Sequence, residues 1–185
     1  MDFKKLLNSL KFSINYNNDI PRQFIKKILD SSRSNAMYIA EQIQLALGVN
    51  INVTKTNSTE TAIAIIGSSL GLLQNGSALM SSKQGKKIEL LCKDSIKNDF
   101  DLSSEESKII ISGIDQYLKA YEQSWAIKTN PFNKPAGILI MEFMGEKASE
   151  AFQKDNPQIL NPLIHQIIMD FLALMIIEPM KLFKK

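Results

Sequence analysis

Apolar side chains recur at three- and four-residue steps along most of this chain, which is the spacing of one face of an α-helix. The clearest case follows Ser103 and Glu106, which have the spacing of a capping box at a helix start. The apolar stripe behind this box then continues for more than four turns, so it predicts a long amphipathic helix. Its members are Ile110, Ile114, Tyr117, Tyr121 and Trp125.

Capping residues and helix breakers predict where other helices begin and end. Asp19 and Pro21 suit a helix start, because a carboxylate accepts hydrogen bonds from free N–H groups and proline fits the first turn. Gly48 is a typical helix stop. Asn57 and Glu60 have the spacing of a second capping box, with Asn in the cap position. This pair predicts a helix that begins at Asn57.

Proline divides the C-terminal third of the chain into two further helices. The first begins near Pro135 and stops before Asn156-Pro157, and the second runs from Pro162 to about Ile177. In the second helix Leu172 and Ile176 are expected to face the interior.

The N-terminal segment carries a weaker helical pattern. Its apolar residues fall at helical spacing, and its basic residues lie on the other faces. The apolar stripe is Phe3, Leu6, Leu7 and Leu10, and the polar positions are Lys4, Lys5, Asn8 and Lys11.

Residues 49–54 alternate apolar and polar side chains and are rich in β-branched residues, so they are interpreted as a short strand. Residues 87–92 are its proposed partner. Two strands alone make a poor sheet. The predicted fold class is therefore mainly α, a compact multi-helix bundle that leaves room for a minor two-stranded element. No repeat or long linker interrupts the chain, so residues 1–185 are interpreted as one domain.

Composition limits the function classes. The 185 residues are 44% hydrophobic and 22% charged, which is ordinary for a globular protein. The net charge of +3 comes from scattered basic pairs, so no nucleic-acid partner is expected. The single cysteine, Cys92, allows no internal disulfide, and no secretory signal is recognised at the N-terminus. A cytoplasmic location is therefore expected.

Residues that could carry chemistry are few. His165 is the only histidine, and with Cys92 it cannot complete a structural zinc site. Neither residue is expected to act as a nucleophile or base. Gly67 and Gly71 lack the spacing of a phosphate-binding loop, and they are interpreted as small residues that let two helices pack closely. No cofactor or metal is expected.

The aromatic stripe Tyr117, Tyr121 and Trp125 is the candidate partner-binding site. Trp and Tyr are enriched at the energetic centres of interfaces, and they are also ordinary core residues on the apolar face of a helix. Both interpretations stay open. The leading hypothesis is a non-catalytic helical protein that acts through protein–protein contacts, as an adaptor, chaperone or inhibitor.

Two alternatives remain. The apolar stretch 159–177 is nearly long enough to span a bilayer, so membrane association is the first. It is not favoured, because Asp170 near its centre costs about 3 kcal/mol on insertion. The second is a small carboxylate-dependent enzyme using Glu142, which lies in an apolar setting.

Overall fold

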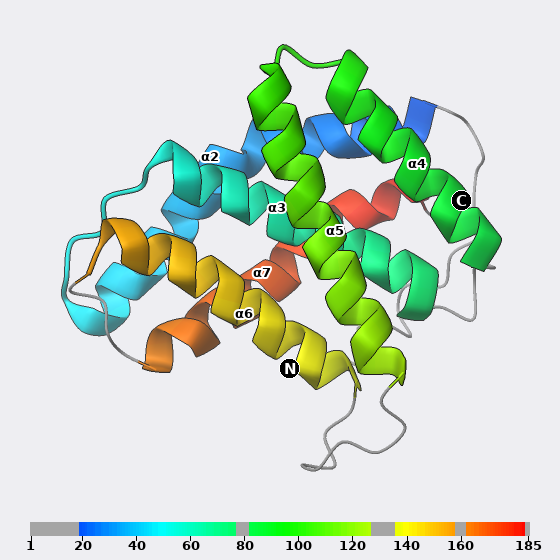
Figure 1. Cartoon of the computed structure of the whole chain (residues 1–185). Helices are drawn as coiled ribbons and strands as arrows, with labels where there is room; N and C mark the ends of the chain where they lie inside the picture. Colours follow the sequence, from blue (N-terminus) through cyan, green and yellow to red (C-terminus); the bar gives the residue numbers. More distant parts are fainter. Residues whose placement is uncertain (1–18, 77–81, 127–135, 158–161, 184–185) are drawn as a thin grey trace.

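A computed structural model of the chain describes residues 19–76, 82–126, 136–157 and 162–183, which form helices joined by short connections (Figure 1). This confirms the mainly α, multi-helix fold class. A π-helical turn, Leu72–Gly76, extends α3, and a 3-10 turn, Lys181–Phe183, follows α7. The helices are α2 (Asp19–Leu47), α3 (Lys55–Gly71), α4 (Ser82–Asn98), α5 (Ser104–Ala126), α6 (Ala136–Asp155) and α7 (Pro162–Met180).

Helix α3 is the centre of the molecule. Every residue from Thr61 to Gly71 is buried, and α3 contacts α2, α4, α5, α6 and α7. In Figure 1, α5 and α6 lie in front of α3, and α2 and α7 lie behind it. A helix that is apolar around its whole circumference needs such cover on all sides. The amphipathic helices around it supply that cover.

All the helices contribute to one hydrophobic cluster around α3. Its largest members, which are almost completely buried, include Tyr117, Tyr121, Phe24, Phe152 and Phe183. The prediction of a single domain covers residues 1–185, some of which lie outside the described ranges, and it stays a prediction.

The proposed strand pair is absent from the described residues. Residues 87–92 lie inside α4, where Ile88, Cys92 and Ile96 recur at four-residue steps and are buried. Residues 49–54 are not helical, but no second strand pairs with them. Instead, the Asn52 backbone N–H donates to Asn156 Oδ1 at 2.8 Å, and the Asn52 carbonyl accepts from Asn156 Nδ2 at 3.0 Å. The amide side chain of Asn156 thus replaces a neighbouring strand.

Of the two capping boxes expected from the sequence, the one at Ser103 is confirmed. The Glu106 N–H donates to Ser103 Oγ at 3.1 Å, and the Ser103 N–H donates to Glu106 Oε2 at 2.8 Å. The carboxylate of Glu106 also pairs with Lys55 at the start of α3.

The predicted helix start at Asn57 is wrong, because the N-cap lies three residues earlier in the chain. Thr54 is the N-cap of α3, and Asn57 occupies the third position, where its side chain accepts a hydrogen bond from the Thr54 N–H at 2.8 Å. Asn57 is completely buried and also donates to the carbonyl of Ala151 on α6 at 2.9 Å. Glu60 therefore has no capping role.

Candidate functional site

Two of the three candidate aromatic residues lie in the core. Tyr117 and Tyr121 are each 1% exposed, on the face of α5 that packs against α3. A Cβ added to Gly67 would lie 2.5 Å from Tyr117 Cβ, and one added to Gly71 would lie 2.5 Å from Tyr121 Cγ. The two glycines therefore permit this close helix crossing, as their apolar surroundings predicted. The side chain of Trp125 lies outside the described part of the structure.

Helix α7 packs into the core along one face and exposes the opposite face to solvent. Its inner face packs into the core through Ile164, Ile168, Leu172, Ala173 and Ile176, and this confirms the predicted orientation of Leu172 and Ile176. Phe171 and Met175 are partly buried against the core, and the outer face exposes Gln166, Asp170, Leu174 and Glu178. A surface helix of a soluble protein usually has polar residues on its outer face. On the outer face of α7, Leu174 is the exception to that rule.

A groove of about 460 Å³ runs between α7 and α2. The Tyr38 and Phe171 rings meet edge to face across it, with their centroids 5.1 Å apart. Tyr38 is 47% exposed and Leu174 is 46% exposed, so both present apolar surface to solvent. The groove is lined by Lys27, Ser31, Asn35 and Tyr38 from α2, and by Phe171, Leu174, Met175, Glu178 and Pro179 from α7.

Two carboxylates lie on the exposed face of α7, one in the groove and one beside it. Asp170 and Glu178 lie four residues before and four residues after Leu174, so they flank it on the same side of the helix. Glu178 is exposed and pairs with Lys181 and, at 3.9 Å, with Lys27 across the groove. Asp170 accepts a hydrogen bond from Gln166 at 2.9 Å and has no cationic partner among the described residues. The groove therefore combines apolar side chains with one lining carboxylate, that of Glu178, and Asp170 lies outside its lining.

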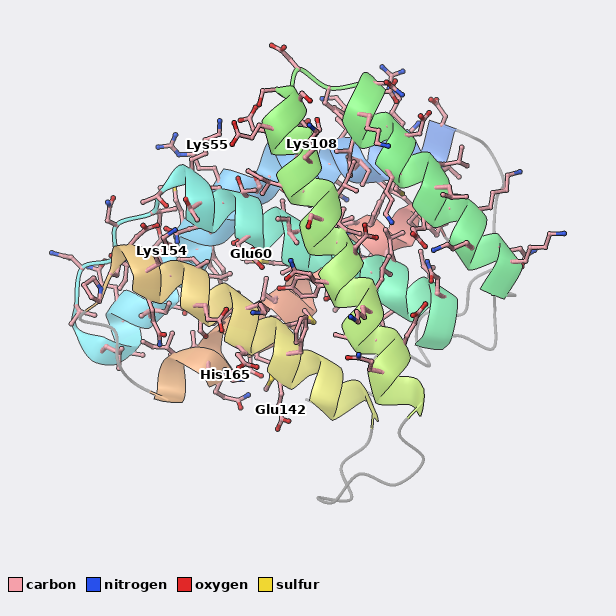
Figure 2. The ribbon with its side chains drawn as sticks, viewed as in Figure 1. Lys55, Glu60, Lys108, Glu142, Lys154 and His165 are labelled. Carbon is pink, nitrogen blue, oxygen red and sulfur yellow. The ribbon has the colours of Figure 1, made fainter. Side chains whose placement is uncertain are left out.

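A second, smaller cleft of about 430 Å³ lies where α3, α5 and α6 meet. Its polar end is Glu60 on α3, which accepts a 3.1 Å hydrogen bond from the Tyr117 hydroxyl. Figure 2 shows Glu60 between α5 and α6, with Lys108 higher on α5. Ile63 and Gly113 line the cleft beside it.

Burial changes the protonation of this pair. Desolvation raises the pKa of Glu60, and the hydrogen bond from Tyr117 and the charge of Lys147 reduce the rise without cancelling it. Desolvation also raises the pKa of Tyr117, and the carboxyl group of Glu60 adds to this effect. A carboxyl group with a raised pKa in a cleft is a common feature of reactive sites. Sequence reasoning missed Glu60 because it placed this residue in a capping box.

The most buried carboxylate belongs to a closed ionic network. Glu89 on α4 is almost completely buried and binds Lys86 at 2.8 Å, Lys93 at 2.6 Å and Gln74 at 2.7 Å. Burial acts to raise the pKa of Glu89, but the hydrogen bonds from Lys86, Lys93 and Gln74 outweigh it, so the pKa is lowered. Lys93 pairs in turn with Asp115 on α5. Because each of these charges has a partner, the network is a structural tie between α4, α5 and the π-helical turn.

The residues with potential nucleophilic or basic chemistry lie apart from one another. Cys92 is completely buried on α4, and burial raises the pKa of its thiol. His165 lies near the start of α7, where its ring packs against Gly145 of α6. Figure 2 shows His165 below α6, far from α4. Glu142 is a half-buried residue of α6, and it does not line the cleft at Glu60.

No protein-family model, curated protein or solved structure matches this chain. Within the described residues, none of the helices combines the length and the apolar character needed to cross a bilayer. The groove and the cleft are therefore the features of the molecule that bear on its function.

Proposed function

We propose that this protein acts through protein–protein contact, and that the groove between α2 and α7 binds an amphipathic segment of a protein partner. The observation that carries the proposal is the groove itself, where Tyr38 of α2 and Leu174 of α7 are half-exposed beside Phe171 and Met175. Helices with apolar anchors at three- and four-residue steps bind in grooves of this kind. An adaptor, chaperone or inhibitor would use such a groove without catalysing a reaction.

The energetics of covering the groove support this role. Full burial of a large apolar side chain contributes about 1.5–3 kcal/mol, so covering the half-exposed Tyr38 and Leu174 would contribute about 1 kcal/mol each. Their aromatic and aliphatic surfaces are contiguous through Phe171. The acidic flank formed by Asp170 and Glu178 would favour a partner segment that carries basic residues beside its apolar anchors.

The proposed setting is the cytoplasm. Cys92 is a buried free thiol, and the chain uses no disulfide for its stability, which suits a reducing compartment.

Photo-crosslinking from the groove tests the proposal. A photoreactive amino acid replaces Leu174 in the full chain, and a matched control carries it at Leu90, an exposed leucine (58%) of α4, a helix that does not line the groove. The captured protein is then purified and its affinity measured for Leu174→Asp and Leu90→Asp. We expect Leu174→Asp to weaken binding at least about tenfold, as loss of a central anchor does, and Leu90→Asp to change it less than about twofold.

Capture at both positions, or equal affinities for the two variants, would contradict the proposed role of the groove. A partner that binds both variants equally well would contact another surface of the chain.

A second candidate function is carboxyl chemistry at Glu60, and the raised pKa of this residue in an open cleft favours it. A thermal-shift screen of small molecules against the wild type and Glu60→Gln tests this idea. Compounds that raise the Tm of the wild type alone would support a ligand site at Glu60. If every stabilising compound raised the Tm of both proteins equally, the proposed ligand site at Glu60 would be contradicted.

A further inference from the structure

We infer that the cleft where α3, α5 and α6 meet binds a small zwitterion, with the amine of this ligand at Glu60 and its anionic group at Lys108. The inference rests on the second candidate function, a ligand site at Glu60, and it names the class of ligand. Three features of the cleft carry it: an oriented carboxyl group, a cation without an ionic partner among the described residues, and apolar side chains in the same lining.

Glu60 is held in place by the core and keeps one oxygen for a ligand. Its Oε1 accepts the 3.1 Å hydrogen bond from the Tyr117 hydroxyl, and Tyr117 is only 1% exposed. Its other oxygen, Oε2, has no hydrogen-bond partner among the residues that the structure describes. An ionised carboxyl group only accepts hydrogen bonds, and an amine cation only donates them. An amine is therefore the group that Glu60 is best suited to bind.

Lys108 supplies the charge for the other end of the ligand. It is an exposed residue of α5 that lines the cleft, and it has no ionic partner within the described part of the chain. Lys147, the other lysine of the lining, pairs with Glu150 at 3.0 Å. A ligand that carried only an amine would meet two lysines, and a ligand that carried only an anion would meet Glu60. A zwitterion complements both kinds of charge, which favours it over either singly charged class.

The apolar part of the lining suits a hydrocarbon link between the two charges. Ile63 of α3 packs against Gly113 of α5, where an added Cβ would lie 2.7 Å from Ile63 Cγ2. Ile109 is 51% exposed beside Lys108, and covering its side chain would stabilise the complex. The volume of the cleft, about 430 Å³, lies within the range of small-molecule sites.

The two charged groups of the ligand are expected to be several bonds apart. Lys108 precedes Tyr117 by nine residues, which is about 14 Å along α5. A helical side chain leans toward the N-terminus of its helix, so the Tyr117 hydroxyl and Glu60 lie closer to Lys108 than this distance. Figure 2 places Lys108 above Glu60 along α5. An amine and a carboxylate at the two ends of a short carbon chain, as in ε-aminocaproate, would fit this arrangement.

Proton release on binding gives an independent readout. Desolvation raises the pKa of Glu60, and the groups that act on it are Tyr117 of α5 and Lys147 and Glu150 of α6. A bound amine cation would favour the ionised carboxylate and lower this pKa. Binding should therefore tighten as the pH rises through the raised pKa of Glu60, and it should release a proton at pH values near that pKa.

Isothermal titration of the full chain with ω-amino acids tests the inference, in a series of rising length that includes γ-aminobutyrate and ε-aminocaproate. Caproate and hexylamine are the controls, because each carries only one of the two charges. We expect at least one ω-amino acid to bind about tenfold or more tightly than either control, because it makes a charge-assisted contact at each end.

Variants of the two charged residues test where each end binds. Glu60→Gln should weaken binding of the tightest ω-amino acid at least about tenfold and abolish the proton release. Lys108→Gln, at an exposed position, should weaken binding about threefold or more and leave the proton release in place. Glu41→Gln of α2 and Lys97→Gln of α4, exposed residues outside the cleft lining, should change the affinity less than about twofold. The Tm of each variant without ligand shows that it folds.

Equal affinities for Glu60→Gln and Glu41→Gln, or no measurable binding of any ω-amino acid, would overturn the inference. Binding of caproate or hexylamine as tight as that of the best ω-amino acid would overturn the zwitterion class.

Failure of every ω-amino acid has a separate meaning from failure of the site. If other compounds from the thermal-shift screen still depended on Glu60, the ligand class would be contradicted and the second candidate function would stand. Neither result bears on the groove between α2 and α7, because the described linings of the groove and the cleft share no residue.

Discussion

The Tyr117 hydroxyl donates a 3.1 Å hydrogen bond to the Glu60 carboxyl group, and this contact joins a core aromatic of α5 to a residue that lines an open cleft. It explains why Tyr117 is buried although its hydroxyl is polar, because a buried phenol requires an acceptor. The contact also couples the protonation of Glu60 to the stability of the fold.

The variant Glu60→Gln should gain stability relative to the wild type as the pH rises above 4.5. The folded chain holds the Glu60 proton more tightly than the unfolded chain, so the contribution of Glu60 to stability is fully present below its ordinary pKa of 4.5 and is lost as the pH rises through the raised pKa. Glutamine has no proton to lose. Chemical denaturation of both proteins between about pH 4 and pH 8 measures the difference.

Tyr117→Phe provides the control for this linkage. Removing the hydroxyl removes a hydrogen bond that lowers the pKa of Glu60, so the loss of stability with rising pH should extend to higher pH than in the wild type. A difference between Glu60→Gln and wild type that does not change with pH would show that Glu60 titrates normally.

The variant Ser103→Ala should lower the free energy of unfolding by about 1 kcal/mol, because the Glu106 N–H loses its side-chain acceptor. Ser104→Ala is the matched control, since Ser104 is the first residue of α5 and does not cap it. Urea denaturation of both variants measures the effect. Equal midpoints for the two variants would mean that the Ser103 hydroxyl does not stabilise the helix start.

The two capping boxes show how far the sequence alone determines the fold. At Ser103 only one capping box fits the sequence, and the predicted helix start is confirmed. Near residue 57 two possible capping boxes overlap, because Thr54 with Asn57 and Asn57 with Glu60 have the same spacing. The choice depends on Asn57 donating to Ala151 of a distant helix. No local sequence signal predicts that tertiary contact. Because the contact was not predicted, Glu60 was assigned to a capping box and its place in the cleft was missed.

The groove could be predicted only in part. The period of α7 correctly predicted that Leu172 faces the core, but Leu174 stands among exposed polar residues, and the pattern does not show whether a neighbour covers it. The placement of α2 decides this, because Tyr38 meets Phe171 and leaves Leu174 open. The strand pattern of residues 49–54 failed for a similar reason: the side chain of Asn156 pairs with Asn52 where a second strand was expected.

Gly71→Ala should destabilise the protein by about 1–3 kcal/mol, since the added methyl group would lie 2.5 Å from Tyr121 Cγ and force α3 and α5 apart. Thermal and chemical denaturation measure the loss. Adding Tyr121→Leu to the Gly71→Ala variant should cost less than the sum of the two single changes, because the smaller side chain gives the methyl group room. Strict additivity would contradict the close contact between these two residues.

Leu172 and Leu174 are chemically identical, lie two residues apart on α7 and face opposite environments, which makes them a matched pair. Leu172 is completely buried, so Leu172→Ala should lower the free energy of unfolding by about 2–5 kcal/mol through lost burial and a residual cavity. Leu174→Ala removes a half-exposed side chain in the groove and should cost less than about 1 kcal/mol. Chemical denaturation of both variants gives the comparison. Similar losses at the two positions would mean that the outer face of α7 is already covered as firmly as its inner face, and the groove would then be closed to a partner.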